Sequence, residues 1–297
     1  MKEKLKQIDD LTCLGEEYEV LYNPEDKWTD HEHMLPGVRR GEIAVLAAAG
    51  ASGKSYLSQI FGMAIASGEP VFSFLPKRSQ PRSVVYFQFE DLWVDLYNRG
   101  NEILRAYPQM DISPTRMMFQ SFAVPGMTLG LVGEGGVDWD LEEKLKKLWR
   151  GKDLVILDPL TNIWSGCDEN DQGAVMVLMN SLRRIARESK SAILICHHVN
   201  KGALLNKTTS EASAVRGSGA IVNSPRCVMT MATGQSSYET VITWVKLNNH
   251  APISPVTLYR GHKGVLYEDS RQAERSRMAG KSLPVCIDIR CSSTTPF

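Results

Sequence analysis

The chain has 297 residues, of which 43% are hydrophobic and 23% are charged, so it has enough apolar material for one large domain with a buried core. Its 34 Lys and Arg residues balance 34 Asp and Glu residues, which gives a formal net charge of zero. This balance argues against a cationic protein that coats DNA, but it does not exclude a local basic groove.

Residues 1–40 are polar and rich in turn-forming residues, and we predict that they form an N-terminal arm. From residue 42 onward, short apolar runs alternate with longer segments of helical periodicity. The runs that we predict as core strands lie at residues 42–50, 82–91, 115–122, 152–160 and 191–198. The segments that we predict as helices lie at residues 54–68, 92–107, 139–150 and 175–186, the first of them closed by Gly68.

The last third of the chain changes to mainly β-rich runs, at residues 226–233, 240–247, 255–261 and 264–268. Strands that are continuous in Val, Ile and Leu are typical of a parallel sheet covered on both faces. We therefore predict an α/β fold with a largely parallel twisted sheet flanked by helices and with antiparallel strands added toward the C-terminus. Residues 41–268 form the predicted core domain, and residues 269–297 form a tail that we expect to be loosely ordered.

The cysteines and the N-terminal segment both bear on the compartment. Six cysteines occur without a C-x-x-C pair, which is typical of free thiols in a reducing cytosol. The N-terminus is charged throughout and has no apolar signal-peptide segment, and no apolar run approaches the length of a membrane span. We therefore predict a cytoplasmic protein with no membrane partner.

The segment AAAGASGKS, Ala47–Ser55, lies between the first predicted strand and the first predicted helix. In that position successive backbone amides wrap a phosphate, and the helix N-terminus adds partial positive charge. Lys54 would reach the β- and γ-phosphates of ATP, and the Ser55 hydroxyl would ligate Mg²⁺. The residues predicted to bind the nucleotide here are Gly50, Ala51, Ser52, Gly53, Lys54, Ser55 and Tyr56.

The segment departs from the usual P-loop pattern at one position. The pattern opens with Gly, whereas this chain has Ala48 there. Ala tolerates left-handed backbone dihedrals less well than Gly, so the difference matters if this residue is in the turn. Gly50 and Gly53 still supply permissive backbone.

Two acidic residues follow predicted strands. Asp158 ends LVILD at a strand edge that faces the ligand crevice in an open α/β sheet, and it is predicted to hold the water shell of Mg²⁺ together with Ser55. Glu90 is the candidate general base that polarises the attacking water. Its neighbour Asp91 competes for that role, and capping of the following helix by the acidic pair is an alternative.

The stretch ICHHVNKG, residues 195–202, carries adjacent histidines at the end of a predicted core strand. Such a doublet can ligate a metal, act as an acid–base pair or fill the strand end. No partner ligand stands at zinc spacing, which makes the metal interpretation a minor one.

Together these segments resemble the RecA-like P-loop ATPases, and most closely the plasmid RepA-type hexameric replicative helicases. The resemblance rests on GASGKS, VVYFQFED, LVILDPL, ICHHVNKG, AVRGSGAIVNSPR and VKLNNHAP, which occur in the family's order between Gly41 and Tyr267. It implies a RecA-like core in a homo-oligomeric ring of six, with ATP and Mg²⁺ between subunits and single-stranded DNA as partner.

The resemblance also implies roles for individual residues. Glu90 would be the catalytic carboxylate, and a histidine of the doublet would sense the γ-phosphate. We favour His197 for this sensor, because Asn and Lys extend the polar run after His198. Arg216 would be an arginine finger that reaches a neighbour's nucleotide, or else a solvated loop residue. Lys246 would be a basic residue that acts across the interface, or else a strand-end lysine.

Two long polar connections, residues 161–173 and 201–215, follow strands at the same predicted sheet edge. In the resembling family such loops grip DNA, and Lys201 and Lys207 would contact phosphates. Trp164 would either stack on a base or pack in the core. The first connection, however, has no Lys or Arg and carries three acids, Asp168, Glu169 and Asp171.

The ordered motifs favour an ATP-driven motor on single-stranded DNA, a replicative helicase of a plasmid, phage or other mobile element. The acidic first connection and the zero net charge favour the alternative, a RecA-like ATPase that regulates or assembles without unwinding. A small-molecule kinase is disfavoured, because the chain has no Arg-rich lid segment.

Overall fold

The computed structural model describes residues 32–76, 80–112, 116–124, 126–166, 168–200, 203 and 210–280. The chain divides into two compact units, residues 1–31 and residues 32–297. The first unit lies outside the described residues, so the fold below is that of the second.

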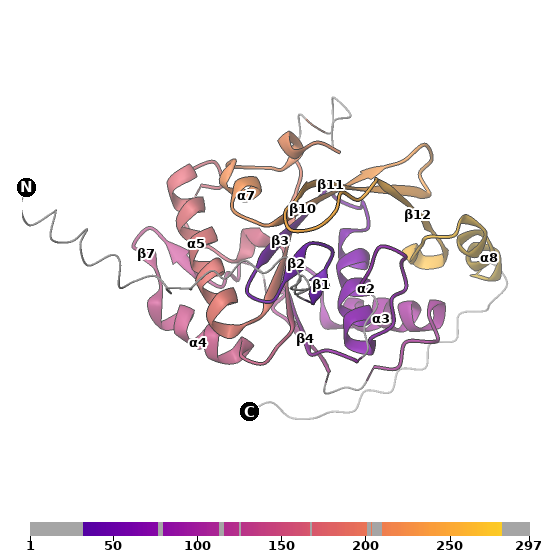
Figure 1. Ribbon diagram of the computed structural model, residues 1–297, viewed down its shortest axis with the longest axis horizontal. Coiled ribbons are helices and arrows are strands. Elements are labelled where there is room, and N and C mark those ends of the chain that lie inside the picture. Colours follow the sequence, from indigo (N-terminus) through magenta and orange to yellow (C-terminus); the bar gives the residue numbers. More distant parts are fainter. Residues whose placement is uncertain are drawn as a thin grey trace, which may run out of the picture. The chain divides into compact units, whose positions relative to one another are not determined.

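The described residues form a nine-stranded sheet as their central element (Figure 1). Parallel pairing joins β10 (Cys227–Thr233), β3 (Ile43–Ala48), β9 (Ala192–His198), β8 (Leu154–Asp158), β4 (Val84–Gln88) and β5 (Met117–Ser121), in that order. Antiparallel pairing then extends the sheet beyond β10 with β11 (Glu239–Leu247), β12 (Val256–Arg260) and β13 (Leu266–Tyr267). The predicted fold class, with antiparallel strands added toward the C-terminus, is confirmed.

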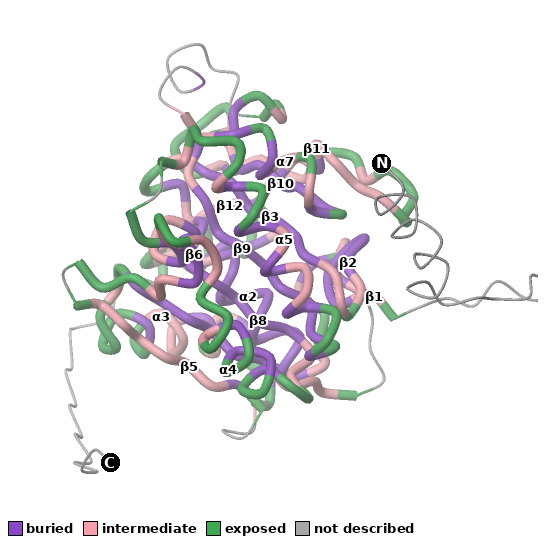
Figure 2. Tube along the Cα trace, turned by 90° about the vertical axis from the view of Figure 1, so that its left-hand side faces the viewer, coloured by how far each residue is buried: buried purple, intermediate pink, exposed green. Residues whose placement is uncertain are grey.

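Helices cover both faces of the sheet (Figure 1). One face packs against α2 (Lys54–Ser67) and α3 (Trp93–Ala106), and the other against α4 (Trp139–Trp149), α5 (Gln172–Ser189) and the short α7 (Ala220–Asn223). Successive residues of β3 alternate between the two apolar clusters, and the central strands β3, β4 and β8 are buried throughout (Figure 2). This double coverage is why the core strands read as continuous apolar runs. In the described part of the chain, no helix is long and apolar enough to cross a membrane.

The helix signals in the sequence are borne out in the structure. Helix α2 ends at Gly68, whose φ of 83° is left-handed and favours glycine. Helix α5 buries the apolar residues that share its predicted face, namely Val175, Leu178, Met179, Leu182, Ile185 and Ala186.

Two segments differ from their sequence-based predictions. The predicted arm ends in a hairpin of β1 (His33–Leu35) and β2 (Val38–Arg39) that buries three apolar side chains in the core. The predicted loose tail begins with helix α8 (Ser270–Gly280), in which Ala273 is buried and the Ser276 hydroxyl accepts a hydrogen bond from the backbone of His262 at 3.1 Å. In both segments the few apolar residues stand among polar ones, so composition did not predict the tertiary contacts that order them. Residues 281–297 lie outside the described part.

Shorter elements complete the described structure. A second hairpin pairs β6 (Val132–Gly133) with β7 (Gly136–Val137). Single 3-10 turns lie at η2 (Leu160–Asn162), η3 (Ala212–Ala214) and η4 (His262–Gly264).

Glu142 of α4 is fully buried against α5 and is held by charged donors. Arg184 donates to its two oxygens from Nε at 2.9 Å and Nη2 at 2.8 Å, and Lys146 Nζ lies 3.2 Å from Oε1. Burial alone would raise the pKa of Glu142, but hydrogen bonds from Arg184, Ser181 and Lys146 outweigh it and lower the pKa to about 2. This carboxylate therefore connects two helices on one face of the sheet.

We expect replacement of Glu142 by Gln to lower the free energy of unfolding at pH 7 by about 3 kcal/mol. Because the folded pKa lies below the unfolded one, the charge stabilises the protein above pH 4.5, and this stabilisation is lost as the pH falls toward 2. Urea unfolding at pH 7 and pH 3 measures the effect. A difference between the two proteins that stays the same at both pH values would contradict the prediction.

Candidate functional site

The loop of residues 49–53, which we call the cradle, lies between the end of β3 and the start of α2. Gly53 precedes the helix with a φ of 91°, and Ala51 is also left-handed with a φ of 57°. The start of α2 has no side-chain cap and no acidic residue in its first turn. Its first amides and its partial positive charge therefore suit an anion.

Ala48, which replaces the first Gly of the usual P-loop pattern, causes no backbone strain in this fold. Ala48 is the last residue of β3 and pairs with His198 of β9 and Met231 of β10. It thus has strand geometry, and the left-handed turn falls later, at Ala51 and Gly53. Where a left-handed alanine does occur, at Ala51, it costs on the order of 1 kcal/mol.

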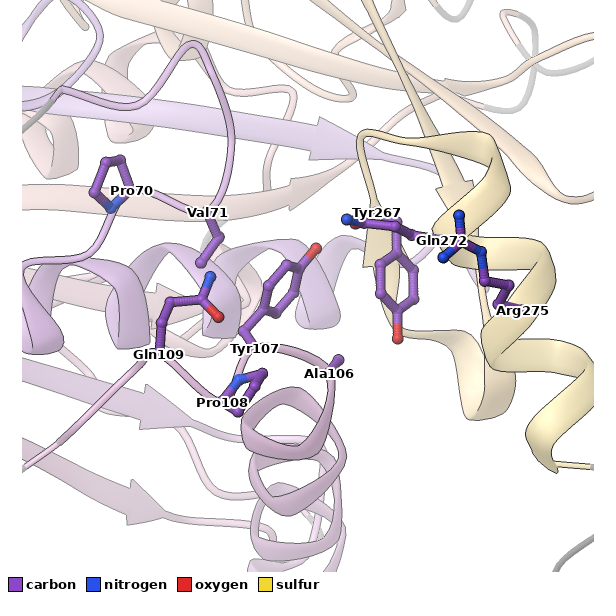
Figure 3. A pocket seen from close by; sticks show the side chains of 9 residues that line it. All are labelled: Pro70, Val71, Ala106, Tyr107, Pro108, Gln109, Tyr267, Gln272 and Arg275. Atoms are coloured by element: carbon purple, nitrogen blue, oxygen red, sulfur yellow. The ribbon is translucent and has the colours of Figure 1, made fainter.

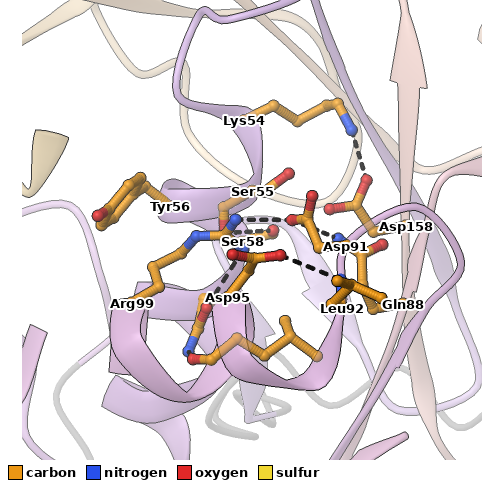
Figure 4. A network of polar contacts seen from close by, with 12 residues as sticks. Lys54, Ser55, Tyr56, Ser58, Gln88, Asp91, Leu92, Asp95, Arg99 and Asp158 are labelled. Carbon is orange, nitrogen blue, oxygen red and sulfur yellow. Dashed lines mark hydrogen bonds and ion pairs between the residues drawn. The ribbon is translucent and has the colours of Figure 1, made fainter. Parts of the chain in front are cut away.

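A buried charged pair closes the cradle from the side of β8 (Figure 4). Lys54 Nζ donates to Asp158 Oδ1, and the Tyr86 hydroxyl donates to Asp158 Oδ2 at 2.8 Å. Ser58 Oγ lies 2.8 Å from the same Tyr86 hydroxyl. Tyr86 and Ser58 were not among the predicted residues, because no motif marks a tyrosine inside an apolar strand.

The charges of this pair stabilise each other. Burial would raise the pKa of Asp158, but the charge and hydrogen bond of Lys54 lower it. Burial would likewise lower the pKa of Lys54, yet Asp158 holds it above its usual value. Both groups are therefore ionised at neutral pH. A charged lysine can bind a phosphate oxygen, and a charged carboxylate can bind a divalent cation.

The donor set beside Asp158 fits Mg²⁺. The Ser55 side chain lies close enough to Asp158 to contribute to lowering the pKa of that carboxyl, so the two predicted ligands lie together. A hydroxyl and a carboxylate are the oxygen ligands that Mg²⁺ prefers in nucleotide sites, where it keeps several waters. The structure therefore brings together Lys54, Ser55 and Asp158, as the sequence predicted.

The structure separates the two acids that compete at the end of β4. Asp91 Oδ2 accepts from Arg99 Nη2 at 2.6 Å and from Gln88 Nε2 at 2.8 Å (Figure 4). The side chain of Glu90 is 53% exposed, and its Oε1 lies 3.8 Å from His198 Nε2. Asp91 is thus engaged in holding α3 to the sheet, and Glu90 is the acid that can face a ligand.

The histidine doublet points two ways. His197 is fully buried, and its Nε2 lies 2.9 Å from the backbone oxygen of Arg216. Because the carbonyl can only accept, Nε2 carries the proton. Burial lowers the pKa of His197 to about 4, so the ring is neutral at pH 7.

His198 has a different setting. Its side chain is 28% exposed and lies toward Glu90. The sequence favoured His197 as the residue beside the phosphate, but the structure places His197 under the Arg216 turn and His198 beside the candidate base. The doublet is no metal site by the residues described, which contain no cluster of three or more His, Cys, Asp or Glu side chains suited to a metal ion.

Arg216 lies in a turn held by neighbouring segments. Its backbone N–H donates to the His198 oxygen at 3.0 Å, and its Nε donates to Glu169 Oε1. Its side chain is 48% exposed. The structure thus fixes the base of Arg216 while leaving the end of the side chain near the surface.

The structure does not bring Lys246 to the cradle of its own chain. Lys246 pairs with Val228 near the start of β10, away from the phosphate edge of the sheet. Its Nζ donates to the backbone oxygens of Val222 at 3.2 Å and Asn223 at 2.6 Å. Within this chain its contacts are with the end of α7, so a nucleotide contact would have to cross to another copy.

The three acids of the first polar connection have partners within the chain. Asp171 caps α5 by accepting from Gly173 N at 2.8 Å and Ala174 N at 3.2 Å. Asp168 Oδ1 accepts from the backbone and the side chain of Asn170, and Glu169 pairs with Arg216. The acidity that argued against DNA therefore has a structural explanation.

Of the residues predicted to contact DNA, the structure describes Trp164 but not the two lysines. Trp164 is buried in the core and forms a β-bridge with Val132, so packing, not base stacking, is its role in this structure. Lys201 and Lys207 lie outside the described residues.

Sequence reasoning missed Arg260 of β12, which lies under the cradle. Its Nη2 donates to the Ser52 oxygen and, at 3.0 Å, to Thr240 Oγ1, and its Nη1 donates to the Ala51 oxygen at 3.3 Å. These bonds support the left-handed turn at Ala51. No sequence signal points to a residue more than 200 positions away from the loop that it supports.

A separate cavity of about 480 Å³ lies between the end of α2, the end of α3, β13 and α8 (Figure 3). Tyr107, Tyr267 and Arg275 are among its lining residues. The Tyr107 hydroxyl is already used, since it donates to the Leu266 oxygen at 2.5 Å. None of the predicted nucleotide-binding residues lines this cavity.

Comparison with known proteins agrees with this geometry. The AAA domain family matches residues 25–203, which is more than half of the chain. The RadB recombinase superposes with a TM-score of 0.50 at 13% identity, covering 77% of this chain and 91% of that chain. A DnaB-like replicative helicase, solved in a study of its interactions with primase, gives a TM-score of 0.57 at 11% identity, covering 82% of this chain and 65% of that chain. At these identities the likeness concerns the fold alone, which is RecA-like.

Proposed function

Since this chain belongs to the AAA domain family, we propose that it is a Mg²⁺-dependent ATPase that assembles into a ring and works as a motor on single-stranded DNA. The observation that carries the proposal is the buried Lys54–Asp158 pair beside the uncapped start of α2. This combination offers backbone amides, a lysine and a metal-holding carboxylate to a triphosphate. The nucleotide site would comprise Gly50, Ala51, Ser52, Gly53, Lys54, Ser55 and Tyr56.

Each residue beside the cradle has a definite task in the proposed hydrolysis. Ser55 and Asp158 would hold Mg²⁺, which would supply positive charge that stabilises the negative charge on the phosphates. Lys54 leaves Asp158 and binds the β- and γ-phosphate oxygens. Glu90 accepts a proton from the attacking water, and His198 at its side orients that water or senses the γ-phosphate.

Arg216 would complete the site of a neighbouring copy. Its backbone is held at the end of β9, and about half of its side-chain surface is exposed. A guanidinium that reaches the transferring phosphoryl group in trans couples hydrolysis to assembly. We propose a hexameric ring on this basis, with Lys246 as a second basic residue at the interface.

The proposal of a DNA motor of the plasmid RepA type is supported by the ordered motifs and by the internal pairing of the acidic connection. The alternative is a regulatory or assembly ATPase that unwinds nothing. It is favoured by the burial of Trp164, which removes one predicted stacking residue.

ATP turnover with and without single-stranded DNA separates the two functions. For a motor we expect stimulation by an unstructured oligonucleotide of about tenfold, with binding that weakens steeply as salt rises. Duplex DNA of the same sequence is the control. Basal turnover without stimulation, together with no binding at low salt, would leave the regulatory ATPase as the function.

A further inference from the structure

Glu169, in the acidic connection after β8, contacts the turn of residues 216–218, which we call the Arg216 turn. Its carboxylate accepts the hydrogen bond from Arg216 Nε, and its backbone oxygen accepts one from Ser218 N at 2.8 Å. Gly217 has a φ of 85°, and a Cβ there would lie 2.6 Å from the Glu169 oxygen. Glu169 therefore contacts three consecutive residues through its main chain and its side chain.

The bond between the two side chains is made at the edge of the guanidinium nearest the backbone. A guanidinium has five N–H groups in a fixed fork, so a bond at Nε leaves the four terminal ones outside it. The Glu169 side chain is only 15% exposed while that of Arg216 is 48% exposed. The carboxylate is thus the more buried partner, and the terminal N–H groups of Arg216 are left outside this bond.

The end of β9 holds the same arginine from the other side. The His198 oxygen accepts from Arg216 N at 3.0 Å, and His197 Nε2–H donates to the Arg216 oxygen at 2.9 Å. A solvated loop arginine needs none of these contacts. Here the main chain and Nε of Arg216 are both fixed, and the fixing residues come from the connection after β8 and from the end of β9.

We propose that Glu169 is a positioning residue for Arg216 and sets the direction in which the guanidinium reaches a neighbouring copy's nucleotide. This inference rests on the proposed function, in which Arg216 acts in trans. An arginine whose rotamers are fixed in advance loses less conformational entropy when it meets the phosphates, and small errors in placement cost large factors in rate. Because Glu169 does not contact its own cradle, its effect falls on turnover and not on nucleotide affinity.

The test measures kcat and KM for ATP in the full chain with three substitutions of Glu169. We expect Glu169→Ala and Glu169→Asp each to lower kcat about tenfold or more, with KM within about twofold, since neither side chain reaches Nε in the same place. Glu169→Gln keeps the length and an oxygen that accepts from Nε, so it should lose no more than about threefold. Thermal unfolding of each variant checks that the turn is folded. If Glu169→Ala does not fold, the order of the Gln and Asp variants still decides.

Arg216→Ala supplies the reference. If Glu169 acts through Arg216, adding Glu169→Ala to Arg216→Ala changes kcat by less than about twofold. Mixing Glu169→Ala protein with Glu90→Gln protein should restore activity, because the Glu90→Gln copies supply a correctly held Arg216 to sites with an intact Glu90.

The outcomes separate the two proposals. Loss of turnover in Arg216→Ala with normal turnover in Glu169→Ala and Glu169→Asp overturns the positioning role alone. A low kcat for Glu169→Gln together with a normal kcat for Glu169→Asp also overturns the positioning role. That result would mean that the charge of residue 169 matters and the placement of its oxygen does not. Normal turnover in Arg216→Ala contradicts the arginine finger itself, and with it the proposed function.

Discussion

Replacing Lys54 with Ala is expected to abolish ATP turnover, with a loss of about 10³-fold or more, because Lys54 is the cation that pairs with Asp158 among the described residues and that would meet the β- and γ-phosphates. The effect on stability should also be large. Lys54 and Asp158 are both buried, and removal of one partner leaves an uncompensated buried charge that typically costs roughly 3–5 kcal/mol. Phosphate release and urea unfolding measure the two effects.

The double variant Lys54→Ala/Asp158→Asn distinguishes catalysis from folding. Removing the orphaned charge should recover most of the lost stability, because the Asn side chain still accepts from the Tyr86 hydroxyl. It should recover no turnover. Lys263→Ala is a control for the loss of a lysine, since that lysine is exposed and pairs with Glu102 instead of Asp158. Turnover of Lys54→Ala within about twofold of the wild-type value would mean that the nucleotide binds elsewhere.

Replacing Glu90 with Gln should lower ATP hydrolysis by about 10²–10⁴-fold while ATP binding is preserved. Gln keeps the size of the side chain but cannot take the proton of the attacking water. Glu90 is half exposed, and its ion pair among the described residues is the 3.8 Å contact with His198, so its loss should leave the unfolding free energy within about 0.5 kcal/mol. Single-turnover hydrolysis and nucleotide binding measured on the same protein separate the two steps.

Asp91→Asn is the matched control for Glu90→Gln. It removes the charge that pairs with Arg99 at 2.6 Å, so it should lower stability and change the hydrolysis step by less than about threefold. The assignment of the catalytic carboxylate would be wrong if Asp91→Asn stopped hydrolysis and Glu90→Gln did not.

The sequence by itself determined the local features of this protein. Apolar periodicity marks the face of α5 from Val175 to Ala186, and Gly68 marks the end of α2, because both signals arise within a few residues of chain. The cradle was equally predictable. A phosphate-binding turn uses consecutive amides and the first residues of one helix, so its pattern is contiguous in the sequence.

Tertiary structure decided which of two adjacent candidates faces the site. The assignment of Asp91 to a structural role depends on Arg99, which lies eight positions later in α3. The assignment of His197 depends on the carbonyl of Arg216, 19 positions later. Adjacent residues of a strand end point to opposite faces, and no sequence pattern tells which face holds the ligand.

The longest-range contacts were decided by the fold alone. Glu169 lies 47 positions before Arg216, and Arg260 lies 208 positions after the Ser52 carbonyl that it supports. In the sequence the acids of the first connection indicated only a negative loop, and Arg260 was a charge in a β-rich run. The order of the strands in the sheet determines which residues become their partners. The residue types alone do not indicate these pairings.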